Sequence, residues 1–186
     1  NIGQNGGTEG IDIGAVKAWN TTTGSKDMIV AVIDTGIRYT HQELVGQMWV
    51  NPDEIAGNGV DDDNDGYIDN VYGVDTVNVD GDPMDDNGHG THCAGTIGAA
   101  ANDGNAHVGV AWEVSLMACK FLSADGWGYT SGAISGIDFA VANGARILSN
   151  SWGGGGYSQA LYDAIVRAQD AGVVFVAAAG NSGLDT

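Results

Sequence analysis

The sequence predicts an α/β fold of three layers, with a mostly parallel sheet between helices on both of its faces. Continuous apolar runs without polar alternation, such as residues 28–33, are typical of strands that are buried on both sides of a parallel sheet. Along the chain these runs alternate with segments whose apolar residues recur at helical spacing. That alternation is the pattern of parallel sheets covered by helices.

Length and composition set the broad class of the chain. With 186 residues, of which 43% are hydrophobic, it has enough apolar material for the core of one domain, 1–186. The formal net charge of −18 comes from 24 Asp and Glu against 6 Lys and Arg. This acidity argues against nucleic acid or an anionic membrane surface as a partner, and it suits a secreted protein that binds cations. No apolar run approaches the roughly 18 residues of a transmembrane helix.

The first strand is expected at residues 28–34, after a glycine-rich arm and a short helical turn at residues 15–19. It reads M-I-V-A-V-I-D and ends at Asp34. In open α/β sheets the reacting groups gather beyond the carboxyl ends of the strands. Asp34 is therefore a candidate site residue, although Asp is also a common turn former.

A second candidate lies in the stretch N-G-H-G-T-H-C-A-G-T-I-G, residues 87–98, which we expect to open a helix. His89 lies at the polar start of this segment. Imidazole is the side chain best suited to general acid–base chemistry near neutral pH, and the positive end of a helix dipole favours its neutral, proton-accepting form. A lone histidine is more often a loop residue without chemistry, so the interpretation depends on its partners.

The second half of the chain continues the alternation. Apolar runs predict strands at 114–122 and 147–150, and a further buried strand in the run 173–183, which delivers Asn181 at its carboxyl end. One helix is expected to be capped by Thr130 or Ser131 and to end at Gly144, and another is expected before the last strand. The apolar positions of the two helices are Ile134, Ile137 and Val141 in the first, and Leu161, Ala164, Ile165 and Ala168 in the second.

An acidic segment at residues 58–69 reads N-G-V-D-D-D-N-D-G-Y-I-D. Alternate carboxylates on a loop that doubles back at Gly66 can all face one hard cation, which is how calcium collects roughly six to eight oxygen ligands. Carboxylates so close in sequence repel one another unless a cation neutralises them, so we expect a calcium loop; the alternative is a solvated acidic hairpin. The expected ligands are Asp61, Asp63, Asp65, the carbonyl of Tyr67, and Asp69.

A looser acidic cluster comes just before His89, and there we expect a solvated loop. Its members are Asp80, Asp82, Asp85 and Asp86.

The two cysteines, Cys93 and Cys119, fall in the helix that follows His89 and in the strand at 114–122. Both lie in apolar company, which favours buried free thiols. A disulfide between them remains an alternative, because the sequence does not show whether they meet.

Four ordered motifs give the chain a resemblance to a known family. They are V-I-D-T-G at 32–36, H-G-T-H-C-A-G-T at 89–96, S-W-G-G at 151–154 and A-A-A-G-N at 177–181. In order and spacing they resemble the subtilisin-like serine proteases. The resemblance implies that Asp34 orients and stabilises the imidazole, that His89 is general base and then general acid, and that Asn181 is the side-chain donor of the oxyanion hole.

The same resemblance implies where a polypeptide substrate lies. The segment A-D-G-W-G-Y, residues 124–129, is similar to the edge on which these proteases lay the substrate as an added antiparallel strand, and S-W-G-G is similar to a second edge. The expected substrate-binding residues are Gly126, Trp127, Gly128, Ser151, Trp152 and Gly153.

One element of the family pattern does not occur in this sequence. The nucleophilic serine of these proteases lies in a G-T-S-M-A segment well beyond the oxyanion asparagine, and no serine here lies in such a segment. We therefore expect an N-terminal portion of the catalytic domain, inactive by itself, whose C-terminal remainder is a separate chain or absent. The alternative is a non-catalytic, calcium-stabilised fragment that only binds its complementary segment or a peptide.

Two further classes of hydrolase share parts of these motifs. The run Asp34-Thr35-Gly36 is also the signature of aspartic proteases, but those enzymes need a second D-T-G and an all-β pattern, and this sequence has neither. The spacing His89-x-x-His92 allows a metal site, but no general-base glutamate follows His89.

Overall fold

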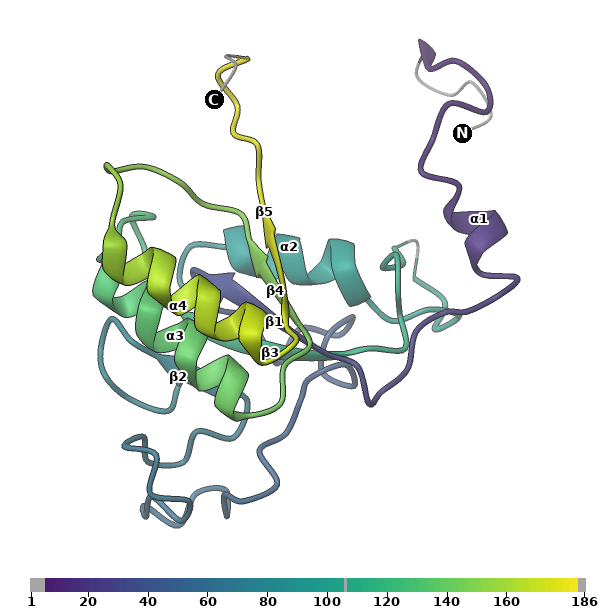
Figure 1. The fold of residues 1–186 in the computed structure, drawn as a ribbon. Helices are drawn as coiled ribbons and strands as arrows, with labels where there is room; N and C mark the ends of the chain where they lie inside the picture. Colours follow the sequence, from purple (N-terminus) through teal and green to yellow (C-terminus); the bar gives the residue numbers. More distant parts are fainter. Residues whose placement is uncertain (1–5, 106, 184–186) are drawn as a thin grey trace.

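The computed structural model describes residues 6–105 and 107–183. It confirms the predicted α/β class: a parallel sheet lies between helices (Figure 1). The strand β2 was not predicted, because three residues give too short a run to be recognised. In chain order the elements are α1 (Ala15–Ala18), β1 (Ile29–Asp34), β2 (Gly73–Asp75), α2 (His89–Gly98), β3 (Ser115–Lys120), α3 (Thr130–Ala142), β4 (Ile147–Asn150), α4 (Gln159–Asp170) and β5 (Val174–Ala177).

The five strands form one sheet in the order β2-β3-β1-β4-β5, and every neighbouring pair is parallel. The central strand β1 is paired on both sides, and its last residue, Asp34, lies opposite Lys120 of β3. Because the strands are parallel, their carboxyl ends share one edge of the sheet. The segments that follow β1, β3 and β4 therefore start close together.

The two faces of the sheet are covered by different helices. Val30 and Val32 belong to a core cluster with Ala94 of α2, whereas Ala31 and Ile33 belong to a second cluster with residues of α3 and α4. Successive residues of β1 thus point to opposite faces and both faces are buried, which is why the strand reads as an unbroken apolar run.

The starts of the two long helices differ. At α4, the Ser158 hydroxyl accepts a hydrogen bond from the backbone N–H of Leu161 at 3.3 Å, the usual N-cap arrangement. At α3 the N-cap is Tyr129 and no side chain caps the helix, so the prediction that Thr130 or Ser131 does so is wrong. Thr130 is already the first helical residue.

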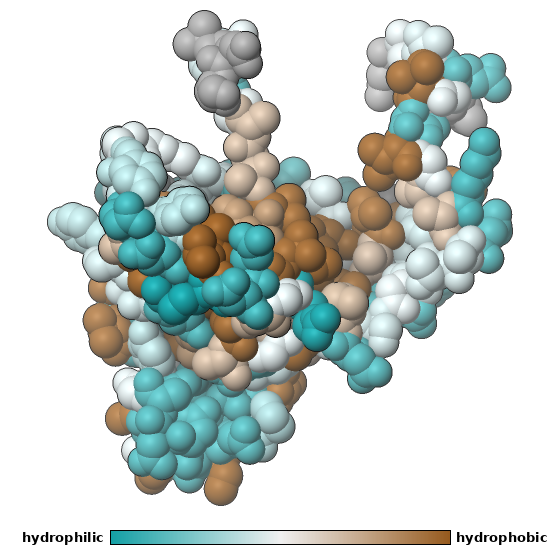
Figure 2. All heavy atoms as spheres, in the orientation of Figure 1, coloured by the Kyte–Doolittle hydropathy of each residue, from teal (hydrophilic) through white to brown (hydrophobic). Residues whose placement is uncertain are grey.

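Strand β5 forms one edge of the sheet, and its outward-facing residues are apolar. Val174 and Val176 are 57% and 50% exposed. Figure 2 shows hydrophobic residues gathered beside this strand, and in Figure 1 the chain that follows β5 extends away from the rest of the fold. Among the described helices, none is both long enough and apolar enough to cross a membrane.

Candidate active site

Asp34 and His89 meet at the carboxyl edge of the sheet. The Asp34 carboxylate, at the end of β1, is fully buried, and its Oδ1 lies 2.8 Å from Nδ1 of His89 at the start of α2. The same oxygen accepts a hydrogen bond from the backbone N–H of Thr35 at 2.7 Å. A carboxylate at Nδ1 favours the tautomer whose proton is on that atom, which leaves Nε2 free to accept a proton. The His89 side chain is 50% exposed, so substrate can reach it.

The absence of a side chain at Gly90 allows this contact. A Cβ atom at Gly90 would lie 2.1 Å from the carbonyl oxygen of Gly36 and 3.2 Å from Oδ1 of Asp34. Any other residue would push the first turn of α2 away from the end of β1, and His89 would move with it. The close contact between α2 and the end of β1 thus requires a glycine at position 90.

Asp85 holds the start of α2 against β1. Its carboxylate accepts hydrogen bonds from the Thr35 hydroxyl at 2.8 Å, from the Gly88 N–H at 2.8 Å and from the Thr91 N–H at 2.9 Å. Burial alone would raise the pKa of Asp85, but the hydrogen bonds, first that of the Gly88 N–H and then that of the Thr91 hydroxyl, outweigh burial and lower it. The Asp85 carboxylate therefore stays ionised, and its negative charge complements the positive N-terminal end of α2.

The expectation of a solvated acidic loop before His89 is therefore wrong for two of its members. Asp85 is held by the interactions above, and Asp86 pairs with the buried Lys120 at 2.6 Å. Sequence reasoning missed both, because their partners, Thr35 and Lys120, lie far away in the chain. The only local signal was the position of Asp85 within one turn of the helix start.

The six predicted substrate-binding residues gather around one pocket beside His89. The pocket has a volume of about 680 Å³, and it is lined by Gly126, Trp127, Gly128, Ser151, Trp152 and Gly153 together with His89. The indole of Trp152 packs against Phe121 with ring centroids 4.8 Å apart, whereas Trp127 is 79% exposed. The segments after β3 and β4 thus form two sides of a cleft that ends at the imidazole.

Asn181 is not brought into this pocket. It lies beyond the end of β5 in the segment that extends from the fold, it is exposed, and it is not among the residues that line the pocket. The strand that precedes it, β5, has no neighbour on its outer side among the described residues, because it is the edge strand of the sheet. The motif A-A-A-G-N therefore makes Asn181 a candidate donor of the oxyanion hole, but in the described structure Asn181 does not line the pocket beside His89.

Both cysteines are free, in agreement with the prediction, but they are not equally buried. Cys119 lies in the core, whereas Cys93 is half-buried, with its sulfur 3.9 Å from Nδ1 of His89. Burial raises the pKa of the Cys93 thiol. The thiol is therefore neutral and lies at the nitrogen already occupied by Asp34, an arrangement unsuited to a cysteine nucleophile activated by Nε2.

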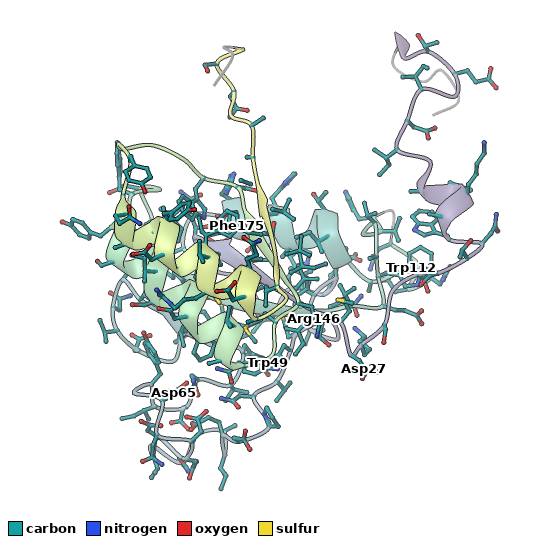
Figure 3. The ribbon with its side chains drawn as sticks, viewed as in Figure 1. Asp27, Trp49, Asp65, Trp112, Arg146 and Phe175 are labelled. Carbon is teal, nitrogen blue, oxygen red and sulfur yellow. The ribbon has the colours of Figure 1, made fainter. Side chains whose placement is uncertain are left out.

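The acidic segment at 58–69 folds into loops below the helices, where Asp65 lies among oxygen-bearing side chains (Figure 3). Carboxylate oxygens of Asp61, Asp63 and Glu54 lie within 4.8 Å of one another. Glu54 was not predicted, because it lies before the acidic run. Its Oε1 accepts from the Asp62 N–H at 2.6 Å, whereas its Oε2 is a buried atom that has no hydrogen-bond partner among residues 6–105 and 107–183.

The other three predicted calcium ligands, Asp65, Asp69 and Tyr67, lie in different places in these loops. Asp65 lies beside this cluster, because its backbone N–H donates to Oδ1 of Asp61 and Oδ1 of Asp63 at 3.1 Å. Its own carboxylate accepts from the Tyr67 N–H at 2.9 Å and from Nδ2 of Asn70 at 2.7 Å, and burial raises its pKa. Asp69 instead accepts hydrogen bonds from the backbone N–H groups of residues 57–59, and it stabilises that turn. The ring of Tyr67 packs against Phe139 of α3 with centroids 6.1 Å apart, which anchors the loop to the core.

Comparison with known proteins agrees with this geometry. Residues 25–186 match the Subtilase family, peptidase S8. Subtilisin-like protease 1 of Plasmodium vivax is 38% identical over 157 residues, which cover 84% of this chain and 25% of that protein. Thermitase of Thermoactinomyces vulgaris is 34% identical over 171 residues, which cover 92% of this chain and 53% of that protein.

A solved structure shows the same likeness. The crystal structure of a cold adapted subtilisin-like serine proteinase superimposes with a TM-score of 0.62 at 36% sequence identity, over 85% of this chain and 49% of that chain. The chain thus spans between a quarter and about half of the length of these relatives. By its sequence and its fold, the chain belongs to the subtilase family.

Proposed function

We propose that the complete protein is a serine endopeptidase, which hydrolyses internal bonds of polypeptide substrates, and that this chain supplies two members of its triad. The observation that carries the proposal is the 2.8 Å contact between the buried carboxylate of Asp34 and Nδ1 of the half-exposed His89. In this mechanism His89 takes the proton of a serine hydroxyl through Nε2 and returns it to the leaving amine. Asp34 stabilises the imidazolium that forms.

The nucleophilic serine is proposed to come from a part of the domain that this sequence does not cover. Within the described residues, no serine or threonine hydroxyl forms a hydrogen bond with the His89 ring. The relatives are two to four times as long as the matched region, which leaves room for the serine segment. By itself, the chain is proposed to be inactive because His89 has no serine hydroxyl from which to take a proton.

The proposed place of the missing part is the outer edge of β5. An edge strand presents unpaired N–H and C=O groups, and Val174 and Val176 on this strand are half-exposed apolar side chains. Strand addition there would pair the unpaired backbone groups, and residues that accompany the added strand on the same face of the sheet would cover both valines. We propose that Asn181 then donates its side-chain N–H to the oxyanion, the role implied by A-A-A-G-N.

The same edge supports a second candidate function. A chain whose serine segment is absent would act as a non-catalytic fragment that binds its complementary segment or a peptide along β5 or the pocket. The two candidates predict the same binding and differ only in hydrolysis.

The decisive experiment measures casein hydrolysis by the complete protein and its inhibition by phenylmethylsulfonyl fluoride. We expect hydrolysis, complete inactivation, and the addition of one sulfonyl group on a serine outside this sequence, whereas residues 1–186 give no hydrolysis. Inhibition by a pepstatin-type compound instead would indicate an aspartic protease. Binding of a complementary segment without any hydrolysis would support the second candidate, the non-catalytic fragment.

We propose further that the protein is secreted, which the charge of −18 and the family likeness support.

We also propose that the acidic loops hold a calcium ion. The fit is suggested by the buried, unpartnered Oε2 of Glu54 beside the carboxylates of Asp61 and Asp63, a set of hard oxygen donors. Asp65 adjoins them, and its raised pKa reflects the burial and mutual repulsion that a cation would relieve. The role proposed for the ion is to hold the loops against the core at Tyr67.

Removal of calcium is expected to lower the melting temperature of the complete protein by about 5–10 °C, because an ion at about a hundred times its Kd contributes about 2.7 kcal/mol. Differential scanning calorimetry with and without a chelator measures the shift. Glu54→Gln should lose the response to chelator, and Asp163→Asn, an exposed acid on α4, should keep it. An unchanged melting temperature of the unmodified protein in chelator would refute the calcium site.

A further inference from the structure

Lys120 is buried beneath the candidate active site. It is the last residue of β3, lies opposite Asp34 in the parallel register, and is only 1% exposed. Lysine is among the residues least often buried, because an ammonium ion that leaves water needs partners that compensate for the lost hydration. The partners of this side chain therefore indicate its role.

The ammonium group of Lys120 has three N–H donors, and each of them has an acceptor. Nζ donates to the backbone carbonyl of Thr35 at 2.8 Å, to Oδ1 of Asp86 at 2.6 Å and to the backbone carbonyl of Leu122 at 2.8 Å. The bonding capacity of the group is thus completely used within the protein.

Each acceptor belongs to a different segment of the site. Thr35 follows Asp34, and Asp86 lies three residues before His89. Leu122 lines the pocket and lies two residues before the first substrate edge, residues 124–129, of which residues 125–128 also line it. A single cation therefore connects the segments that hold the acid, the base and the substrate.

A packing role alone does not explain this arrangement. The neighbouring buried residues of β3, Leu116, Met117 and Ala118, are apolar, and an apolar side chain at position 120 would fill the same space without a charge. The Asp86 side chain is 51% exposed, so the pair is not a closed ion pair within the core. Two of the three bonds go to backbone carbonyls, and such bonds fix the paths of loops.

We propose that Lys120 is a positioning residue for the proposed peptidase. It holds the Asp34–Thr35 turn, the segment before His89 and the first substrate edge in fixed relative positions. The kinetic part of its test rests on the proposed function, whereas the spectroscopic part does not. A misplacement of about 1 Å in an active site can lower the rate by about 10²-fold, so loss of this connection should be visible in both kcat and KM.

The test compares Lys120→Met with Lys120→Arg in the complete protein. Methionine keeps the length of the side chain without charge or donors, and arginine restores both. Rates are measured on a peptide substrate long enough to extend along the first substrate edge. They are divided by the concentration of active sites, which is determined by titration with an irreversible serine-directed inhibitor. We expect Lys120→Met to lower kcat and raise KM, so that kcat/KM falls by about 10²-fold, and Lys120→Arg to recover a large part of the loss.

Met117→Ala is the matched control, because it creates a cavity in the same buried strand without touching the three acceptors. It should lower the melting temperature but leave KM, and kcat per titrated active site, unchanged. If Lys120→Met behaves in the same way, the proposal is wrong. If Lys120→Met does not fold, Asp86→Asn takes its place, with a smaller change in the same direction expected; unchanged constants in that variant overturn the proposal.

A spectroscopic measurement separates this proposal from the proposed function. The Nδ1 proton shared by His89 and Asp34 is expected to give a low-field ¹H NMR resonance whether or not the protein hydrolyses peptides. The resonance should be present in the unmodified protein and in Met117→Ala, and broadened by faster exchange in Lys120→Met. An unmodified protein that shows the resonance without hydrolysis refutes only the peptidase function. An unchanged resonance in Lys120→Met refutes the positioning role.

Discussion

Replacement of His89 by alanine is expected to lower kcat of the complete protein by about 10⁶-fold, the size of the loss when the base is removed from subtilisin itself. The imidazole is held by Asp34 at 2.8 Å, and the side chain is half exposed and lines the pocket. Without it, a hydroxyl in the pocket keeps its proton and remains a poor nucleophile. The measurement is kcat for a chromogenic peptide, with the folded fraction determined by circular dichroism.

His92→Ala is the matched control for this variant. His92 lies on the same helix, three residues further along, and lines a different pocket with His41 and Leu44. It should keep the activity of the unmodified protein. A His89→Ala protein that hydrolyses the peptide as fast as His92→Ala would exclude His89 as the base.

Replacement of Asp34 by asparagine is expected to lower kcat by about 10⁴-fold, as the same change does in serine proteases of an unrelated fold that carry the same triad. Both Thr35 N–H and Nδ1 of His89 lie at Oδ1, so the amide oxygen of asparagine would take that position and the geometry would be kept. The amide still lacks the negative charge that stabilises the imidazolium. An amide also no longer fixes the imidazole tautomer, so the fall in kcat reports the loss of the carboxylate's electrostatic and tautomeric role rather than a loss of fold.

The melting temperature distinguishes these two causes. Asp34 is fully buried and, within the described part of the chain, its Oδ2 has no hydrogen-bond partner, so a neutral side chain of the same shape should not unfold the protein. We expect the melting temperature of Asp34→Asn to stay close to that of the unmodified protein while kcat falls. A parallel fall of both quantities, or activity that survives the change, would contradict the role of Asp34.

The parts of the fold and site that the sequence predicted are those with a local signal. β1 reads as an apolar run because both faces of the strand are covered, and His89 is recognisable at the start of a glycine-rich helix. Asp34 follows from its place at the end of the strand. In each case a few adjacent residues contain the whole physical reason.

The parts that the sequence did not predict depend on distant partners. Lys120 and Asp86 are 34 residues apart, and nothing in either segment indicates the pair. Asp85 appeared to be one of several solvated acids until its bond to Thr35, 50 residues away, was known. Glu54 lies outside the acidic run and joins it only because the loop turns back.

The bare edge of β5 also has a consequence for biosynthesis. During synthesis and folding, the unpaired backbone groups along this edge are exposed whenever nothing covers it. A strand edge with outward-facing valines is a template for cross-strand pairing with other molecules. A partner strand at this edge, as proposed above, would remove that template and so protect the chain from aggregation.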